Sequence, residues 1–200
     1  MSGIINRFFG KKVLINEELL ALADRLSFRN SQLDSFLMGH FLKGDKTSLD
    51  EYFAFQKQVL ELQVDRFESI QIELDLLKQY LKLIEHVVAD GFSVKWENKL
   101  PCHEEIMLPP LIFFPMIQHA VKNGYNTMSS HPVRIRLSGS PKVLIWEVSY
   151  RVNHYLEDQF SDTLLVDFQK RLAYLFPQKH NLLLNSNSNT ARITLSVQLF

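Results

Sequence analysis

Four polar side chains that could bind a ligand lie close together on one short segment, residues 115–124. They are Gln118, His119, Lys122 and Asn123. Pro115 suits the first turn of a helix, where no amide donor is needed, and Gly124 suits a left-handed cap at its end. On such a helix His119 and Asn123, four residues apart, share one face. They could contact a ligand together or belong to a hydrogen-bonded polar cluster.

A second group of reactive side chains is the run Cys102-His103-Glu104-Glu105, whose sulfur, nitrogen and oxygen atoms are all possible metal ligands. The run lacks a second cysteine or histidine at ligand spacing, and Cys102 is the only cysteine of the chain. An internal disulfide and a cysteine-based zinc cluster are therefore excluded. We interpret the run as a solvated loop and predict no metal site.

The composition narrows the classes of partner. The chain has 200 residues, and its 22 lysines and arginines balance 22 aspartates and glutamates, so no overall charge attracts it to nucleic acid or to an acidic membrane. Arg134 and Arg136 alternate on an expected strand, and we interpret them as the solvent side of a sheet. The apolar content of 46% is typical of a soluble globular protein. No secretory pattern and no run of about 18 apolar residues is present, so we expect a cytoplasmic protein without a transmembrane segment.

Apolar residues at helical spacing dominate the first 90 residues. Residues 1–14 form a short apolar and basic tail, which could pack on the domain or lie on a membrane surface. Asn16 is placed to cap a helix that runs to Gly44, and Ser48 begins a second helix. The first helix carries an apolar stripe made of Leu19, Leu22, Leu26, Leu33, Leu37 and Phe41.

A third helix has the clearest pattern. Its apolar residues alternate steps of four and three, as in a coiled-coil seam: Ile70, Leu74, Leu77, Leu81, Ile84 and Val88. Residues 15–90 are thus predicted to form a helical unit that buries its stripes against itself or against a second copy of the chain.

The pattern changes at Gly91 from helical spacing to alternation. Alternating apolar and polar residues predict strands at 92–96, 133–137, 143–148, 182–184 and 193–199. The turn residues 138–141 join the second and third strands in a hairpin, and a helix is expected at 164–176. This order predicts an α+β chain, in which N-terminal helices precede a two-layer α/β sandwich with a mixed sheet and helices on one face.

Three sequence motifs are shared with a known family. They are Glu73-Leu74-x-x-Leu77-x-x-Tyr80-Leu81-x-x-Ile84-Glu85, the run from Pro109 to Gly124, and Arg171-Leu172-Ala173-Tyr174-Leu175-Phe176-Pro177. In this order and spacing they resemble the autolysin-sensor-like (LytS/YehU-like) sensor histidine kinases. In that family the second motif reads roughly Pro-Pro-Leu-Leu-Leu-Gln-Pro-Leu-Val-Glu-Asn-Ala-Ile-Lys-His-Gly.

The resemblance implies a helical dimerisation hairpin followed by a Bergerat-type (GHKL ATPase-like) sandwich. On this basis we divide the chain into a tail (1–14), a helical dimerisation region (15–90) and an ATP-binding-like domain (91–200). The resemblance also implies a homodimer, with the stripe from Ile70 to Val88 as its expected seam. A response regulator or a related kinase is the implied protein partner, and nucleic acid is not.

The residues that carry kinase chemistry in that family are replaced here. The phosphoacceptor histidine is absent from the corresponding region, which contains Ser27 and Arg29, and His40 follows about three turns later. The family's magnesium-binding asparagine and the acid before it correspond to His119 and Gln118. Magnesium prefers oxygen ligands, so an imidazole is a poor replacement.

The other contacts to the nucleotide are also changed. Tyr150 stands where the family has an aspartate or asparagine near the adenine, and its ring could fill the adenine cavity. The phosphate loop has lost its glycines to Asp162 and Leu164, and a carboxylate there would repel phosphate. The vestigial pocket positions are thus Gln118, His119, Lys122, Asn123, Tyr150, Asp162 and Leu164.

These replacements predict a pseudokinase, a non-catalytic signal-transduction module that has lost ATP and magnesium binding and acts through dimerisation and protein contacts. One alternative is a divergent but active histidine kinase or ATPase that uses His40 or another acceptor. Another is a pocket between Phe113, His119 and Tyr150 that holds a different small molecule.

Overall fold

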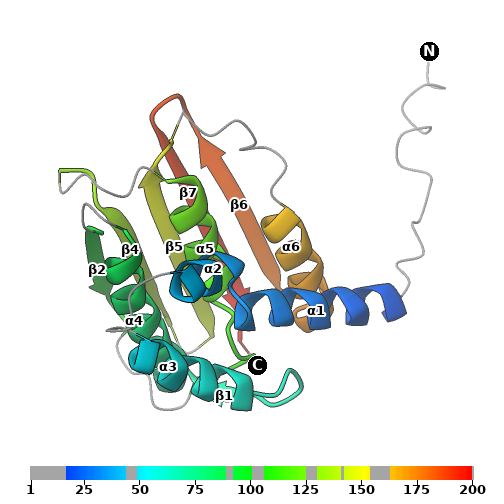
Figure 1. Cartoon of the computed structure of the whole chain (residues 1–200). Coiled ribbons are helices and arrows are strands. Elements are labelled where there is room, and N and C mark those ends of the chain that lie inside the picture. Colours follow the sequence, from blue (N-terminus) through cyan, green and yellow to red (C-terminus); the bar gives the residue numbers. More distant parts are fainter. Residues whose placement is uncertain are drawn as a thin grey trace.

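The computed structural model describes residues 17–43, 49–88, 92–100, 106–124, 130–140, 142–153 and 163–199. Within these ranges four helices precede a five-stranded sheet, and two further helices are inserted between its strands. The helices lie on one side of the sheet (Figure 1). The α+β class and the mixed sheet predicted from the sequence are confirmed. No helix within these ranges is both long and apolar enough to cross a bilayer.

The helices are α1 (Glu17–Gln32), α2 (Ser35–Lys43), α3 (Leu49–Glu61), α4 (Ile70–Val87), α5 (Phe114–Asn123) and α6 (Thr163–Leu175). The large sheet contains β2 (Val94–Asn98), β4 (Val133–Ser140), β5 (Val143–Arg151), β6 (His180–Ser186) and β7 (Thr190–Gln198). Its strand order is β2-β4-β5-β7-β6, parallel between β2 and β4 and antiparallel elsewhere. The short strands β1 (Glu68–Ser69) and β3 (Met107–Leu108) pair separately.

Apolar and polar residues alternate along the strands, so the sheet has one apolar face, which packs against the helices. In β4, for example, Ile135 is buried, whereas Arg134 and Arg136 on either side of it are exposed. The predicted hairpin between β4 and β5 is confirmed. It requires Gly139, because the φ of this residue is +147° and a Cβ there would clash with the carbonyl oxygen of Val143.

The single helix expected over residues 16–44 is instead two helices, α1 and α2. Asp34 lies at the break and caps the second helix, where its Oδ1 accepts a hydrogen bond of 2.9 Å from the amide of Phe36. Its Oδ2 accepts a hydrogen bond of 2.6 Å from the hydroxyl of Tyr80. The break lets α2 pack on α4 while α1 packs along α6.

The buried face of α1 is not the one that its leucines predicted. The exposed fractions are 63% for Leu19, 52% for Leu22, 51% for Leu26 and 46% for Leu33. The opposite face packs on α6 and buries mainly small or polar residues: Ala23, Asp24, Ser27, Phe28, Ser31 and Gln32. Leu37 and Phe41, further along the expected stripe, are only 1% and 4% exposed, so the chain itself covers one end of the stripe and leaves the leucines before it uncovered.

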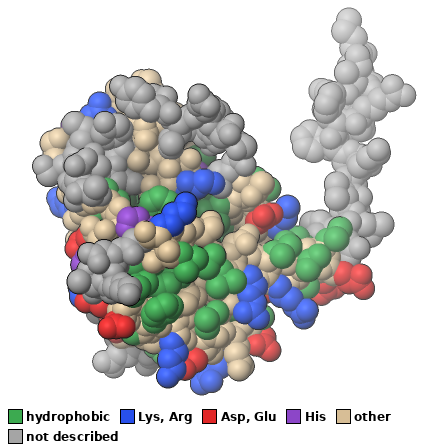
Figure 2. All heavy atoms as spheres, in the orientation of Figure 1, with side chains coloured by type: hydrophobic (Ala, Val, Ile, Leu, Met, Phe, Trp, Pro, Cys, Tyr) green, Lys and Arg blue, Asp and Glu red, His purple; other side chains and the backbone are tan. Residues whose placement is uncertain are grey.

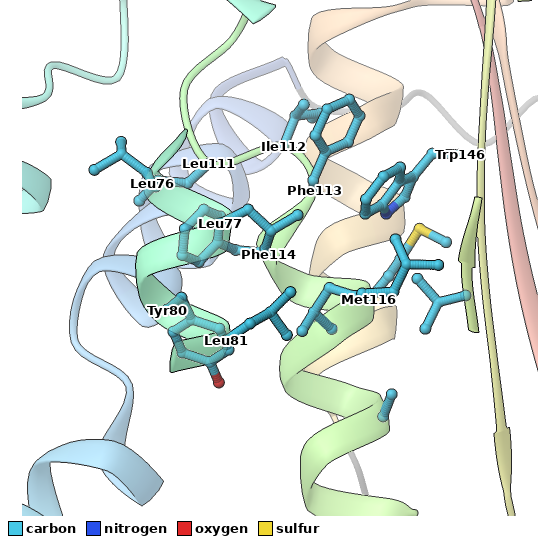
Figure 3. Packing of buried hydrophobic residues seen from close by; sticks show 14 of the residues in the cluster. Leu76, Leu77, Tyr80, Leu81, Leu111, Ile112, Phe113, Phe114, Met116 and Trp146 are labelled. Carbon is cyan, nitrogen blue, oxygen red and sulfur yellow. The ribbon is translucent and has the colours of Figure 1, made fainter. Parts of the chain in front are cut away.

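The seam-like stripe of α4 lies in the core of the chain itself. Its members Ile70, Leu74, Leu77, Leu81 and Ile84 are at most 8% exposed, and Val88 is partly buried. They face the chain's own helices, and Leu77 and Tyr80 lie beside Phe114 of α5 (Figure 3). Because these side chains are covered within one chain, this stripe is not exposed for pairing with a second copy.

Helix α5 occupies the centre of the core. Its first turn contains Pro115, as predicted, and the preceding Phe113 stacks on Trp146 of β5 at 4.3 Å between ring centroids (Figure 3). The left-handed cap predicted at Gly124 is wrong. This residue has φ −93° and ψ 156°, so the chain leaves the helix in an extended conformation and bridges to Val152.

Candidate functional site

A buried carboxylate from α4 holds the loop that precedes α5. Glu73 is 2% exposed and accepts hydrogen bonds from the amides of Leu111 at 2.7 Å and Phe113 at 2.9 Å. These bonds hold Leu111 at φ +58°, a left-handed conformation that leucine rarely adopts. Burial raises the pKa of Glu73 to about 7, although the backbone hydrogen bonds oppose this shift.

A buried arginine from α6 holds the same loop from the other side. Arg171 is fully buried and donates from Nη2 to the carbonyl oxygen of Pro110 at 2.7 Å and from Nε to Asp24 of α1 at 3.1 Å. Its guanidinium lies 5.4 Å from the centre of the Phe28 ring. Burial raises the pKa of Asp24 and lowers the pKa of Arg171, while each charge opposes the shift of the other.

The three motifs recognised in the sequence therefore meet at one point. Glu73 belongs to the first motif, residues 109–113 to the second and Arg171 to the third. Sequence reasoning missed Asp24, because no local pattern indicates a partner that lies 147 positions away. Together these groups set the position of α5, and with it the polar side chains at 118–123.

Three of the residues expected at the nucleotide pocket form a hydrogen-bonded cluster between α5 and β5. Nδ1 of His119 and the hydroxyl of Tyr150 are hydrogen-bonded at 3.0 Å, and the two side chains are 6% and 5% exposed. Asn123, on the same helix, donates to the carbonyl oxygen of His119 at 3.1 Å. The structure thus brings together three predicted residues and joins them to each other. Phe113, the third residue of the expected small-molecule pocket, is fully buried.

A second set of the expected pocket residues borders a hollow of about 520 Å³ between the α1–α2 junction and α5. Gln118, Lys122 and Leu164 line it, together with Asn30, Leu33, Asp34, Ser35, Phe36 and others. Gln118 donates to the carbonyl oxygen of Ser31 at 3.2 Å, so the last turn of α1 is attached to this side of α5. Asp162, the remaining pocket position, lies outside the described residues.

Ser27 and Arg29, which the sequence resemblance places in the phosphoacceptor region, have different surroundings. Ser27 is 1% exposed on the face that packs on α6, and Arg29 is exposed and donates to Oε1 of Gln32 at 2.9 Å. His40 is exposed on α2, with its ring edge-on to Phe41. Within the described part of the chain no three histidine, cysteine or acidic side chains are grouped as metal ligands. The Cys102–Glu105 run lies outside that part.

Asp34 is the main site residue that sequence reasoning missed. It borders the hollow, caps α2 and accepts the hydroxyl proton of Tyr80. A signal was present, because Asp34-Ser35 interrupts an otherwise apolar helical pattern with two residues that favour N-caps.

Known proteins resemble this chain in three-dimensional structure only. No protein-family model matches it, and neither does any curated protein. The Acinetobacter baumannii histidine kinase AdeS is similar with a TM-score of 0.47 and 9% identity, over 85% of this chain and 95% of that chain. A histidine kinase from Burkholderia phymatum STM815 gives 0.45 and 11%, over 94% and 99%. The histidine kinase domain of the Erythrobacter litoralis EL346 blue-light activated histidine kinase gives 0.47 and 14%, over 88% and 95%. These values describe a distant likeness of fold and not of activity.

Replacing Arg171 should destabilise the chain strongly. The Arg171→Met variant leaves Asp24 buried without its counter-charge, which should lower the free energy of unfolding by about 3–5 kcal/mol. Urea denaturation followed by circular dichroism measures this change. Lys170→Met, at the exposed neighbouring position, is the control and should change stability by less than about 0.5 kcal/mol. Equal stability of the two variants would contradict the role of the ion pair.

The buried Glu73 should make stability depend on pH. Its pKa is about 7 in the folded chain against 4.5 for a free glutamate, so the folded state holds an extra proton between these values. Protonation of Glu73 therefore adds about 3 kcal/mol to the free energy of unfolding below pH 4.5. This stabilisation is lost as the pH rises through 7. Denaturant unfolding across this range should show the loss in the parent chain.

Two variants on α4 test whether Glu73 causes that pH dependence. Glu73→Gln cannot titrate and should flatten this part of the profile, even though its amide replaces one acceptor and lowers the overall stability. Glu85→Gln, on the exposed side of the same helix, should leave the profile unchanged. A profile that persists in Glu73→Gln would show that another group is responsible.

Proposed function

We propose that this chain is a non-catalytic signal-transduction module related to the sensor histidine kinases, with a nucleotide pocket that no longer binds ATP or magnesium. The observation that carries the proposal is the buried hydrogen bond between His119 and Tyr150. By the sequence resemblance, these positions correspond to the magnesium ligand and to the adenine contact. A nucleotide would have to break this bond and displace a buried ring.

The surroundings of the pair support the same conclusion. Tyr150 is held in the middle of the sheet by pairing of β5 with β7, opposite Ala191. His119 is held by α5, which the Glu73 and Arg171 hydrogen bonds position. Gln118, in place of the family's acid, is bonded to the carbonyl oxygen of Ser31. His119 and Tyr150 therefore bind each other, and the side-chain amide nitrogen of Gln118 binds the backbone of α1.

In this proposal the module acts by binding proteins in the cytoplasm, first a second copy of itself and then a response regulator or a related kinase. The exposed leucines of α1 are the proposed dimer surface. Figure 2 shows hydrophobic side chains along the outer side of α1. Leu19, Leu22 and Leu26 follow steps of three and four, and Leu33 lies seven residues further on, which is the spacing of helices that pair.

The charges of α1 favour an antiparallel pair. Glu17 and Glu18 lie in its first turn and Arg29 in its last, so antiparallel α1 helices would bring opposite charges together at both ends. An isologous pair of this kind closes as a dimer and does not propagate into a filament.

Isothermal titration of the chain with ATP and magnesium tests the loss of the pocket. We expect a dissociation constant weaker than about 1 mM, because binding must disrupt the His119–Tyr150 pair. Micromolar affinity at the pocket beside α5 would overturn the proposal.

Labelled ATP tests the alternative of an active kinase. We expect no incorporation of label into the chain. Incorporation that disappears in the His40→Ala variant would instead show a divergent kinase that uses this histidine.

Light scattering at tens of micromolar tests the dimer. The parent chain should be a dimer, and Leu22→Asp with Leu26→Asp should make it monomeric, because two carboxylates would be buried in the interface. Leu183→Asp, which changes a similarly exposed leucine on β6, should leave the dimer intact. A monomeric parent chain would contradict this part of the proposal.

A further inference from the structure

The face of the sheet that points away from the helices carries a group of arginines. They are Arg134 and Arg136 on β4, Arg151 on β5 and Arg192 on β7. Arg151 is half-buried and the other three are exposed. Solvent exposure explains why arginine is tolerated on this face, but it does not explain why four of them gather in a chain with no net charge.

Strand pairing places two of these arginines on either side of a serine. Arg134 is paired with Ser149, and Ser149 is paired with Arg192. Neighbouring strands are about 4.8 Å apart, so the backbones of the two arginines flank the serine across about 10 Å. In the adjacent row of the same face Arg151 is paired with Thr190.

The residues of these two rows line a hollow of about 280 Å³. Ser130 and His131, which precede β4, also line it and are hydrogen-bonded to each other at 2.9 Å. The hollow therefore presents guanidinium, hydroxyl and imidazole groups. Among the described residues that line it, none is acidic.

The arginines on this face of the sheet differ in their ion pairs. Arg136, one row further along β4, forms an ion pair of 3.1 Å with Glu97. Arg134, on the same strand and face, has no such partner among the described residues, and its neighbour on β2 is a lysine, Lys95. The ion pair of Arg192 with Glu147 is long, at 3.8 Å.

We propose that this hollow binds a small anion that carries a phosphoryl group. The planar fork of a guanidinium matches two phosphate oxygens at once, so Arg134 and Arg192 can hold such a group from both sides. The hydroxyl of Ser149 supplies a further donor between the arginines. Arg134, Ser149 and Arg192 alternate along their strands with the residues that face the helices, and Tyr150, the partner of His119, also borders the hollow.

The surroundings of the hollow favour a compact ligand over a polymer. The arginines that line the hollow lie in two rows, and the next row contains Glu97 and Glu147. A nucleic acid strand or a long acidic peptide that followed the sheet would meet these carboxylates. A volume of about 280 Å³ suits a ligand of one or two phosphoryl groups.

Titration with inorganic pyrophosphate, at constant low ionic strength and followed by calorimetry and ³¹P NMR, tests the site. The parent chain should bind pyrophosphate, and Arg134→Gln with Arg192→Gln should weaken binding at least about tenfold. Arg136→Gln removes the same charge from the same strand but leaves the hollow unchanged, so it should weaken binding less than about twofold. Circular dichroism checks that each variant is folded.

Two results would overturn the inference. One is the absence of binding by the parent chain at millimolar pyrophosphate. The other is equal weakening by Arg136→Gln, which would show a diffuse charge effect and no specific site. Because ATP also carries phosphoryl groups, ATP binding that is lost in Arg134→Gln with Arg192→Gln belongs to this hollow. ATP binding that persists in that variant belongs to the pocket beside α5 and would contradict the proposed function instead.

Discussion

The buried ion pair between Arg171 and Asp24 joins parts of the chain that are far apart in the sequence. A pair of this kind contributes little net stability, since removing two charges from water costs about as much as their attraction returns. The main effect of the ion pair is to fix the positions of the groups around it. Arg171 also binds the carbonyl oxygen of Pro110, and Glu73 binds the amides of the same loop. Any shift of the loop would leave several buried charged groups without partners, so α5 has one position.

The fixed position of α5 determines what its polar side chains can do. His119 faces Tyr150, and Gln118 reaches the end of α1. By the sequence resemblance, these positions correspond to sites that hold a nucleotide in the sensor histidine kinases. In this chain His119 and Tyr150 bind each other, and Gln118 binds the backbone of Ser31.

The strands and the helices next to them could be predicted because each has one covered face and one open face. The alternation of Ile135 with Arg134 and Arg136, and the proline in the first turn of α5, are local signals of this kind. The buried side of α1 could not be predicted, since it is formed by Asp24 and small residues whose partner, Arg171, lies 147 positions away. The sequence also marked Glu73 and Arg171 as motif residues without showing that they hold the same loop. The hollow beside Ser149 depends on strand register, which no short motif reveals.

The contact of α1 with α6 has a mechanical consequence. Separating the two helices would expose an apolar ring, Phe28, and leave a guanidinium in the core without its carboxylate. A displacement of α1 relative to α6 would therefore break the Arg171–Asp24 ion pair and disturb the loop at Pro110 that Arg171 also binds.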